Sequence, residues 1–220
     1  VFHLLNHASF KAALFMTAGI IDHETGTRDM RRLGGLMRLM PWVGSLALLA
    51  SASMAGLPPF NGFLSKELML EQALDADFWG PMSWAIPVLA TLGGLFAVAY
   101  SVRFVHAVFF NGPARVLADR QQQPQQLTQP HDPPIGMTLP VALLVLLCVA
   151  VGLAPMWIAG PLVRLAASSM LGVPAPAFEF ALWHGFNLPL LMSSVALAGG
   201  TLLYVGLGSG GRLQRYLPGP

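Results

Sequence analysis

The strongest constraint on how this chain can fold is that its apolar residues lie in long, nearly uninterrupted blocks. A helix needs about 20 apolar residues to cross the hydrocarbon core of a bilayer, within a range of ~17–25. The first, fourth, fifth and sixth blocks reach this length, and the second and third are shorter. The blocks cover residues 1–21, 42–57, 62–74, 84–110, 137–158 and 181–207. This pattern predicts an all-α integral membrane protein.

The composition agrees with a lipid environment. Of 220 residues, 55% are hydrophobic and only 10% are charged, whereas soluble domains carry about 25% charged residues. The net charge of +2 would suggest a nucleic-acid partner in a soluble protein. Here most arginines lie between apolar blocks, where they orient the crossings in the bilayer. We therefore expect no nucleic-acid partner.

The single cysteine and the first residue of the sequence each support a further prediction. Cys148 lies inside an apolar block, and one cysteine can form neither an internal disulfide nor a Cys-x-x-Cys metal site. We interpret it as a residue that fills the core or faces lipid. The sequence opens inside an apolar block with Val1 rather than methionine, so we expect a piece of a longer protein.

Pro58 and Pro59 separate the two short blocks, in the sequence Pro-Pro-Phe-Asn. Proline lacks a backbone N–H and breaks a helix. At membrane depth an unpaired backbone is tolerated only where it is buried in protein or lines a wet cavity. Residues 42–74 therefore form either two crossings or one discontinuous crossing.

The arginine distribution favours one discontinuous crossing over 42–74. Arginines cluster in the loop after the first block, in the loop 111–134 and after residue 207, and the remaining loops carry only Arg164. The clustered residues are Arg28, Arg31, Arg32, Arg38, Arg115, Arg120, Arg212 and Arg215. With one crossing over 42–74, all three clusters fall on one side, which the positive-inside bias identifies as the cytoplasm. We predict about five crossings, one of them discontinuous.

Lys11, Lys66 and Arg103 are the cations inside apolar blocks. A charge at the bilayer centre costs at least ~2.5–3.5 kcal/mol on the insertion scale. Such residues normally face a protein interior or water and mark an ion path. Arg103 lies near the end of its block, where a long side chain extends to the interface. The two lysines are therefore the stronger candidates for a site.

His3, His7 and Lys11 are spaced i, i+4, i+8, which places them on one face of a helix. Histidine titrates near pH 6.5 and a desolvated lysine approaches neutrality, so such a row can pass a proton laterally. Two alternatives remain open. The two histidines could bind zinc, although no third ligand lies nearby in the sequence, or the row could be a polar helix contact without a transport role.

Lys66 follows the proline break by one to two turns. Broken helices in transporters form ion sites, because the unwound backbone offers unpaired groups and admits water. The alternative is that Lys66 extends to the membrane interface. Glu67 and Glu71 are spaced i, i+4 and either modulate Lys66 or lie near the membrane surface. His106 is a further candidate, as a proton entry group.

Several stretches resemble one family. H-L-L-N-H-A-S-F-K-A-A-L-F and S-M-A-G-L-P-P-F-N-G-F-L-S-K-E resemble the antiporter-like proteins, which include the large proton-pumping membrane subunits of respiratory complex I and the A and D subunits of Mrp antiporters. The loop D-H-E-T-G-T-R-D, the stretch F-F-N-G-P-A-R, the H-D-P-P loop and A-L-W-H-G-F-N-L-P-L are more similar to Mrp/Pha A subunits. The resemblance covers essentially the whole chain.

The resemblance implies a fold of two inverted five-helix bundles. Residues 1–110 would hold most of the second half-channel bundle, with the broken helix at 42–74. Residues 111–134 would form a polar cytoplasmic loop, 135–207 the C-terminal transmembrane helices and 208–220 a tail. His3, His7 and Lys11 would belong to the central hydrophilic axis, and Lys66 would be the lysine of the discontinuous helix in the second half-channel.

The function implied by the resemblance is proton translocation in a multisubunit Na⁺ or K⁺/proton antiporter. The partners would be the other subunits, the exchanged ions and the lipid of a bacterial cytoplasmic membrane. The chain would be a secondary transporter subunit rather than an enzyme, and no redox cofactor motif occurs in it.

Two other interpretations remain. One is a proton-pumping subunit of complex I or of a membrane-bound hydrogenase. The large subunit of complex I continues into a long helix along the membrane, and none is evident here after the fifth block. The other is a purely structural scaffold, against which the intramembrane Lys11 and Lys66 argue.

Overall fold

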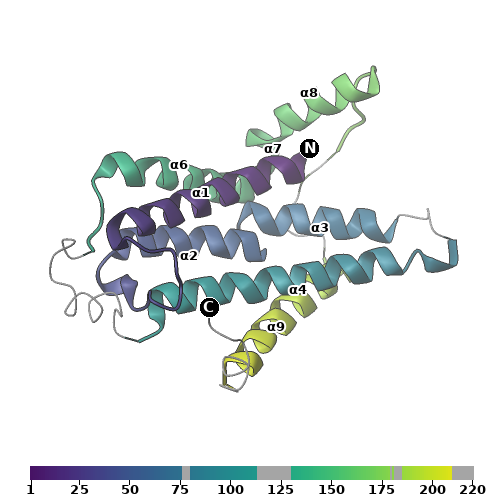
Figure 1. The fold of residues 1–220 in the computed structure, drawn as a ribbon. Coiled ribbons are helices and arrows are strands. Elements are labelled where there is room, and N and C mark those ends of the chain that lie inside the picture. The colour runs from purple at the N-terminus through teal and green to yellow at the C-terminus, as the bar shows by residue number, and fades with distance from the viewer. Residues whose placement is uncertain (76–79, 113–129, 179, 181–184, 210–220) are drawn as a thin grey trace.

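The computed structural model describes residues 1–75, 80–112, 130–178, 180 and 185–209, and within them the chain is built from helices without strands (Figure 1). The longer helices are joined by short helical turns. In chain order the elements are α1 (Phe2–Thr25), η1 (Leu36–Arg38), α2 (Pro41–Ala55), α3 (Asn61–Leu74), η2 (Gly80–Met82), α4 (Ala85–Val105), η3 (His106–Phe110), α6 (Ile135–Leu153), α7 (Pro155–Ile158), α8 (Gly160–Leu171) and α9 (Leu188–Ser209).

Four of the described helices are long and apolar enough to cross a membrane. They are α1, α4 together with η3, α6, and α9 over Leu188–Leu207. The shorter α2 is also apolar. The predicted all-α, multi-pass membrane class is thereby confirmed.

One discontinuous crossing is formed by α2 and α3, which follow each other in the same direction across the bundle (Figure 1). α2 ends at Gly56, which has a φ of 84°, a left-handed conformation that glycine adopts without a steric penalty. Pro58 and Pro59, joined by a cis peptide bond, connect it to α3. The predicted interruption within 42–74 is confirmed, and two half-helices that continue in one direction favour one broken crossing over two.

The break is held in a tight contact that only glycine permits. A Cβ on Gly62, at the start of α3, would lie 1.8 Å from the carbonyl oxygen of Ser53 in α2. A Cβ on Gly152 of α6 would lie 1.9 Å from the carbonyl oxygen of Pro59. Backbone therefore packs directly against backbone on two sides of the break, which fixes where the two half-helices begin and end.

The end of α1, the start of α2, the end of η3 and the start of α6 lie at one end of the bundle (Figure 1). The Asp132 carboxylate accepts hydrogen bonds of 3.1 Å from the backbone N–H groups of Trp42 and Val43, which are otherwise unpaired donors in the first turn of α2. His131 Nδ1 lies 3.2 Å from Glu24 Oε2 in the last turn of α1. The described part of loop 111–134 thus contacts the end of α1 and the start of α2, on either side of the loop that carries the first arginine cluster.

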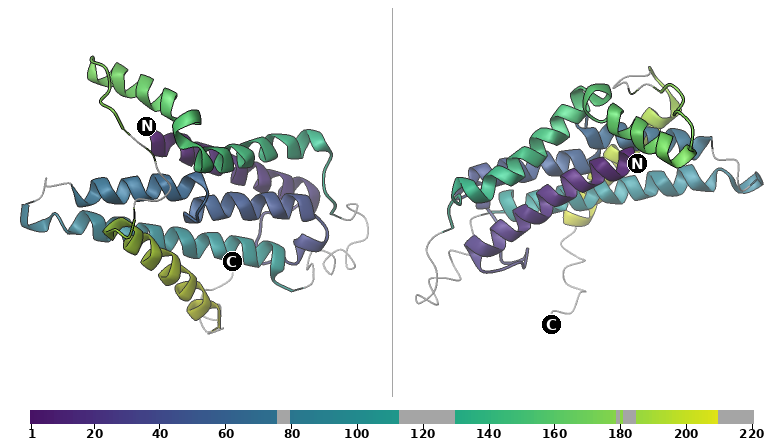
Figure 2. Two further views of the ribbon diagram at one scale, coloured as in Figure 1. Left: turned by 180° about the vertical axis from the view of Figure 1, so that it is seen from behind. Right: turned by 90° about the horizontal axis from the view of Figure 1, so that it is seen from above.

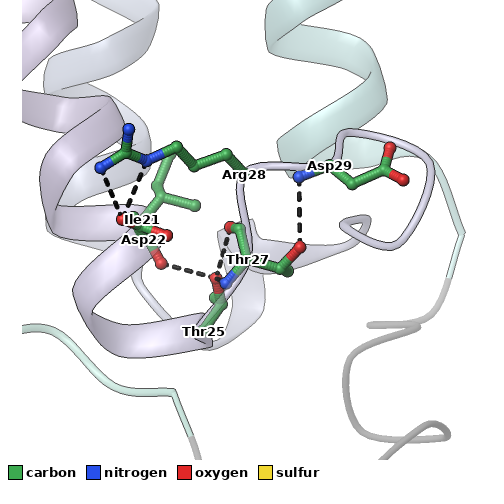
Figure 3. A network of polar contacts seen from close by, with 6 residues as sticks. All are labelled: Ile21, Asp22, Thr25, Thr27, Arg28 and Asp29. Atoms are coloured by element: carbon green, nitrogen blue, oxygen red, sulfur yellow. Dashed lines mark hydrogen bonds and ion pairs between the residues drawn. The ribbon is translucent and has the colours of Figure 1, made fainter.

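A local network shapes the turn after α1 and its first arginine (Figure 3). Thr25 Oγ1 donates to the Ile21 carbonyl at 2.6 Å and accepts from Thr27 N at 3.4 Å. The Arg28 guanidinium forms an ion pair of 2.8 Å with Asp22. This arginine is anchored to the end of α1 and lies outside the membrane-spanning helices. Arg115, Arg120, Arg212 and Arg215 lie outside the described residues.

The structure differs from the sequence prediction after residue 153. The predicted block 137–158 ends early, since α6 stops at Leu153 and Ala154 takes a non-helical conformation before Pro155, as the residue before proline commonly does. Arg164, predicted in a loop, lies in α8, which projects away from the other helices (Figure 1 and Figure 2). The predicted block 181–207 becomes α9, which begins only at Leu188.

α9 packs along α4 through small residues, and the two helices run in the same direction. Gly94 of α4 faces Ala196 of α9. Further along both helices, a Cβ on Gly200 would lie 2.4 Å from the carbonyl oxygen of Leu95 and 2.6 Å from Val98 Cβ. Small residues let helix backbones approach closely in a membrane, so this pair forms one wall of the bundle.

Candidate functional site

A cavity of about 310 Å³ lies between α1, the helix break, α4 and α9. His3, His7 and Lys11 line it from α1, and Lys66 lines it from α3. The structure therefore brings together all four residues that the sequence assigns to a relay, which come from two segments far apart in the chain. The opposite walls are contributed mainly by small and apolar residues of α4 and α9.

The α1 residues form a row because their spacing repeats every helical turn. The ring centroids of His3 and His7 are 5.9 Å apart. Lys11 Nζ lies 5.4 Å from the centroid of the Tyr100 ring of α4, within the range of a cation–π contact. His7 is exposed within this chain, whereas His3 and Lys11 are half-buried. The row thus runs along the cavity toward α4.

Lys66 binds the broken end of α2. Its Nζ donates a 2.7 Å hydrogen bond to the carbonyl oxygen of Ala55, one of the last carbonyls of α2, which have no partner within their own helix. A Cβ on Gly56 would lie 2.7 Å from Lys66 Cδ, so glycine leaves room for the lysine stem. The break supplies both the acceptor and the space that an intramembrane lysine needs.

A hydrogen bond joins the α1 row to the break. His3 Nδ1 lies 3.2 Å from the hydroxyl oxygen of Ser65, the residue before Lys66. The side chain of Ser65 is buried. His3 is therefore the member of the α1 row that contacts α3, and the row and the lysine belong to one connected polar site.

A buried polar cluster, which the sequence did not predict, supports this site. Asn61 Nδ2 donates to Asn6 Oδ1 at 3.0 Å and to Ser9 Oγ at 3.1 Å. Ser53 Oγ donates to Asn61 Oδ1 at 2.6 Å. Cys148, interpreted as core or lipid filler, is fully buried beside Ser9, with Sγ 3.4 Å from its hydroxyl. The cluster locks α1, α2, α3 and α6 together at the break.

Only a weak sequence signal indicated this polar cluster. Asn6 and Ser9 lie on the buried face of α1, away from the His3, His7 and Lys11 row. Polar residues on the inner face of an apolar helix indicate internal hydrogen bonds. Their partner Asn61 lies 55 residues away from Asn6, so the sequence identifies candidates for the contact but not the pairing.

The proposed modulators lie at different places. Glu67 is half-buried, and the Ser193 hydroxyl of α9 donates to its Oε1. Glu71 is exposed one turn further along α3. His106 lies outside the cavity, at the far end of α4, with Nδ1 2.7 Å from the Tyr204 hydroxyl oxygen of α9. Arg103, expected to extend to the interface, is exposed.

The metal alternative gains no support from the described residues. Among them, no group of three or more histidine, cysteine, aspartate or glutamate side chains is placed to hold a metal ion. A structural zinc site has four ligands and a catalytic one three. The pair His3 and His7 therefore lacks the further ligands within the part of the chain that the structure covers.

Comparison with known proteins finds similarity to antiporter subunits. Residues 1–93 match the model of a family described as NADH:quinone oxidoreductase/Mrp antiporter, TM. A probable A/B-type subunit of a K(+)/H(+) antiporter from Rhizobium meliloti (strain 1021) is 49% identical over 204 residues, covering 93% of this chain and 20% of the relative. The A-type subunit of a Na(+)/H(+) antiporter from Bacillus subtilis (strain 168) is 38% identical over 229 residues, covering 99% of this chain and 28% of the relative.

A solved structure agrees with these relatives. A chain in the structure of the Mrp complex from Dietzia sp. DQ12-45-1b superposes with a TM-score of 0.77 at 37% sequence identity, over 98% of this chain and 22% of that chain. The chain thus spans between 20% and 28% of the length of the proteins that it matches.

Proposed function

Because the chain belongs to the NADH:quinone oxidoreductase/Mrp antiporter family and corresponds to a stretch of its A-type subunits, we propose that it carries protons in exchange for Na⁺ or K⁺. The exchange takes place in a multisubunit complex of the bacterial cytoplasmic membrane. This stretch contributes a relay of His3, His7, Lys11 and Lys66. The protein works as part of a secondary transporter.

The observation that carries the proposal is that these four titratable residues line one cavity. Intramembrane ionisable residues are costly and mark ion or proton paths. Each of the four can hold or release a proton, and the cavity has room for the water needed to connect them. A purely structural role would not require four such groups to line a single cavity.

The relay works through electrostatic coupling between neighbouring groups. Two unit charges at the 5.9 Å separation of the His3 and His7 rings repel by about 1–3 kcal/mol for effective dielectric constants between ~80 and ~20. This is enough to change which group holds the proton. When Lys66 gains or loses a proton, the change reaches His3 through the Ser65 contact and then travels along α1.

The alternative is a component of a redox-driven proton pump, since the matching family also includes NADH:quinone oxidoreductase. In that case proton movement would depend on electron transfer in a partner protein and would not respond to added Na⁺ or K⁺. The two curated relatives are named as antiporter subunits, which favours cation exchange.

The test uses everted vesicles from an antiporter-deficient host that expresses the complete complex containing this chain. Respiration builds a pH gradient, Na⁺ or K⁺ is then added, and the gradient is followed with a fluorescent probe. We expect at least one cation to collapse the gradient with the wild-type protein and neither to do so with Lys66→Ala. If neither cation has an effect with the wild type, the redox-pump function replaces this proposal.

A further inference from the structure

We propose that His106 and Tyr204 form the point at which protons pass between the aqueous phase and the relay cavity, at the arginine-rich end of the bundle. This inference rests on the proposed function and adds the route by which the relay reaches water. The pair joins two helices: His106 Nδ1 lies 2.7 Å from the Tyr204 hydroxyl oxygen, and the two rings meet edge to face with centroids 5.8 Å apart.

The position of the pair suits exchange with water. His106 is exposed and lies at the junction where α4 ends and η3 begins. η3 is a π-helix, a wider turn that is rare and frequently occurs at functional sites. The same end of the bundle holds the first arginine cluster, so it is the end that the positive-inside bias assigns to the cytoplasm.

The pair also lies close to the cavity. Tyr100 and Leu197 form its lining nearest to this end of α4 and α9. At 1.5 Å of rise per residue, His106 is about 9 Å beyond Tyr100 along α4, and Tyr204 about 10 Å beyond Leu197 along α9. With hydrogen-bond lengths of ~2.8 Å, two or three water molecules span this gap.

Both helices carry polar groups along this route. On α9, Ser193 lies in the cavity, and Tyr204 follows eleven residues later on nearly the same helix face, because eleven residues complete close to three whole turns. On α4, Tyr100 contacts Lys11, the last member of the α1 row. A proton that enters at His106 therefore reaches Lys11 by way of the wall between α4 and α9.

The pair has the chemistry to transfer a proton without storing charge. In the tautomer whose Nδ1 carries hydrogen, Nδ1–H donates to the Tyr204 oxygen and Nε2 offers a free lone pair to water. Nε2 takes up a proton from water, and Nδ1 passes its proton to the Tyr204 oxygen while the hydroxyl proton leaves to a water on the cavity side. One proton enters and one leaves, no electrons are exchanged, and both residues end neutral.

The test compares His106→Gln and Tyr204→Phe with the wild type in proteoliposomes that contain the complete complex. We expect His106→Gln to slow cation-driven proton movement about tenfold, less than the ~10²–10⁴-fold typical of a proton-transferring group, because water partly replaces the histidine. Imidazole, at equal concentration on both sides, should restore most of the rate, since it supplies the missing proton carrier. Tyr204→Phe should also be slower, and imidazole should not restore it.

His131→Gln is the matched control. His131 lies at the same end of the bundle, its side chain is 66% exposed and its partner is Glu24, so this variant should keep the wild-type rate with and without imidazole. Either of two results would overturn the assignment. One is a wild-type rate in His106→Gln or in Tyr204→Phe, and the other is a slow His106→Gln variant whose rate imidazole does not restore. If the wild-type complex itself exchanges no cation for protons, the proposed function fails as well.

Discussion

Replacing Lys66 by arginine is expected to stop cation-driven proton movement as completely as replacing it by methionine, with a loss of at least about 100-fold in initial rate. Arginine keeps the positive charge and can still bond the Ala55 carbonyl, which the lysine reaches at 2.7 Å. Its guanidinium does not release a proton in proteins. The measurement is the initial rate of collapse of a pH gradient after a cation is added to everted vesicles.

Comparing Lys66→Arg with Lys66→Met distinguishes a role of Lys66 in proton exchange from a role of its positive charge alone. Lys66→Met keeps the length of the side chain beside Gly56, so a loss in both variants is not explained by an empty space. Arg164→Lys is the control, because Arg164 lies in α8, which projects from the bundle, and its replacement should leave the rate unchanged. If Lys66→Arg retained more than half of the wild-type rate, Lys66 would act as a fixed charge and not as a proton carrier.

Gly62→Ala is expected to prevent normal folding of the broken crossing. The added Cβ would lie 1.8 Å from the Ser53 carbonyl oxygen and 2.7 Å from its carbonyl carbon, so α2 and α3 would have to separate. Overpacking of this kind costs typically ~1–3 kcal/mol and occasionally more. Separation would also stretch the 2.6 Å bond from Ser53 to Asn61. The readout is the thermal midpoint of the detergent-solubilised complex together with the amount of folded protein recovered.

Gly19→Ala provides the matched control for this substitution. Gly19 lies in α1, and an added Cβ there meets nothing within 4 Å. Alanine favours a helix over glycine by up to about 1 kcal/mol, so this variant should be as stable as the wild type or slightly more so. A Gly62→Ala protein with the midpoint and yield of Gly19→Ala would show that the two half-helices are not in close contact.

The discontinuous crossing and the α1 row could be predicted because both depend on local chemistry. Pro58 and Pro59 interrupt a helix whatever surrounds them, and the arginine clusters then decide between one and two crossings. The row of His3, His7 and Lys11 follows from the helical repeat alone. Such features need only the order of residues along one segment.

Contacts between distant segments could not be predicted in the same way. The bond between His106 and Tyr204 joins residues 98 positions apart, and the Asn61 bond to Asn6 spans 55 positions. The sequence identifies polar residues in apolar helices, but which ones meet depends on how the helices pack. Sequence alone therefore suggested His106 as an entry group and offered no partner for it.

The region after α6 was mispredicted for a physical reason. Hydropathy over residues 137–158 is nearly continuous, so the block predicts one span, but Pro155 ends the helix at Leu153. α8 was not predicted because its 12 residues are too few to cross a bilayer. A short helix that lies outside the spans has no apolar run long enough to mark it.

The central claim, that the titratable residues of the cavity act in series on one path, is tested most directly by the rate of a double variant. The measurement is the initial rate of cation-driven proton movement for His7→Gln, for Lys11→Met and for the two combined, in vesicles with matched amounts of complex. Residues that act as a unit show strongly non-additive effects. We predict that the double variant is no more than about twofold slower than the slower single variant, since the times taken by successive steps on one path add. If the two losses multiply instead, as effects at independent sites do, the residues do not form one relay.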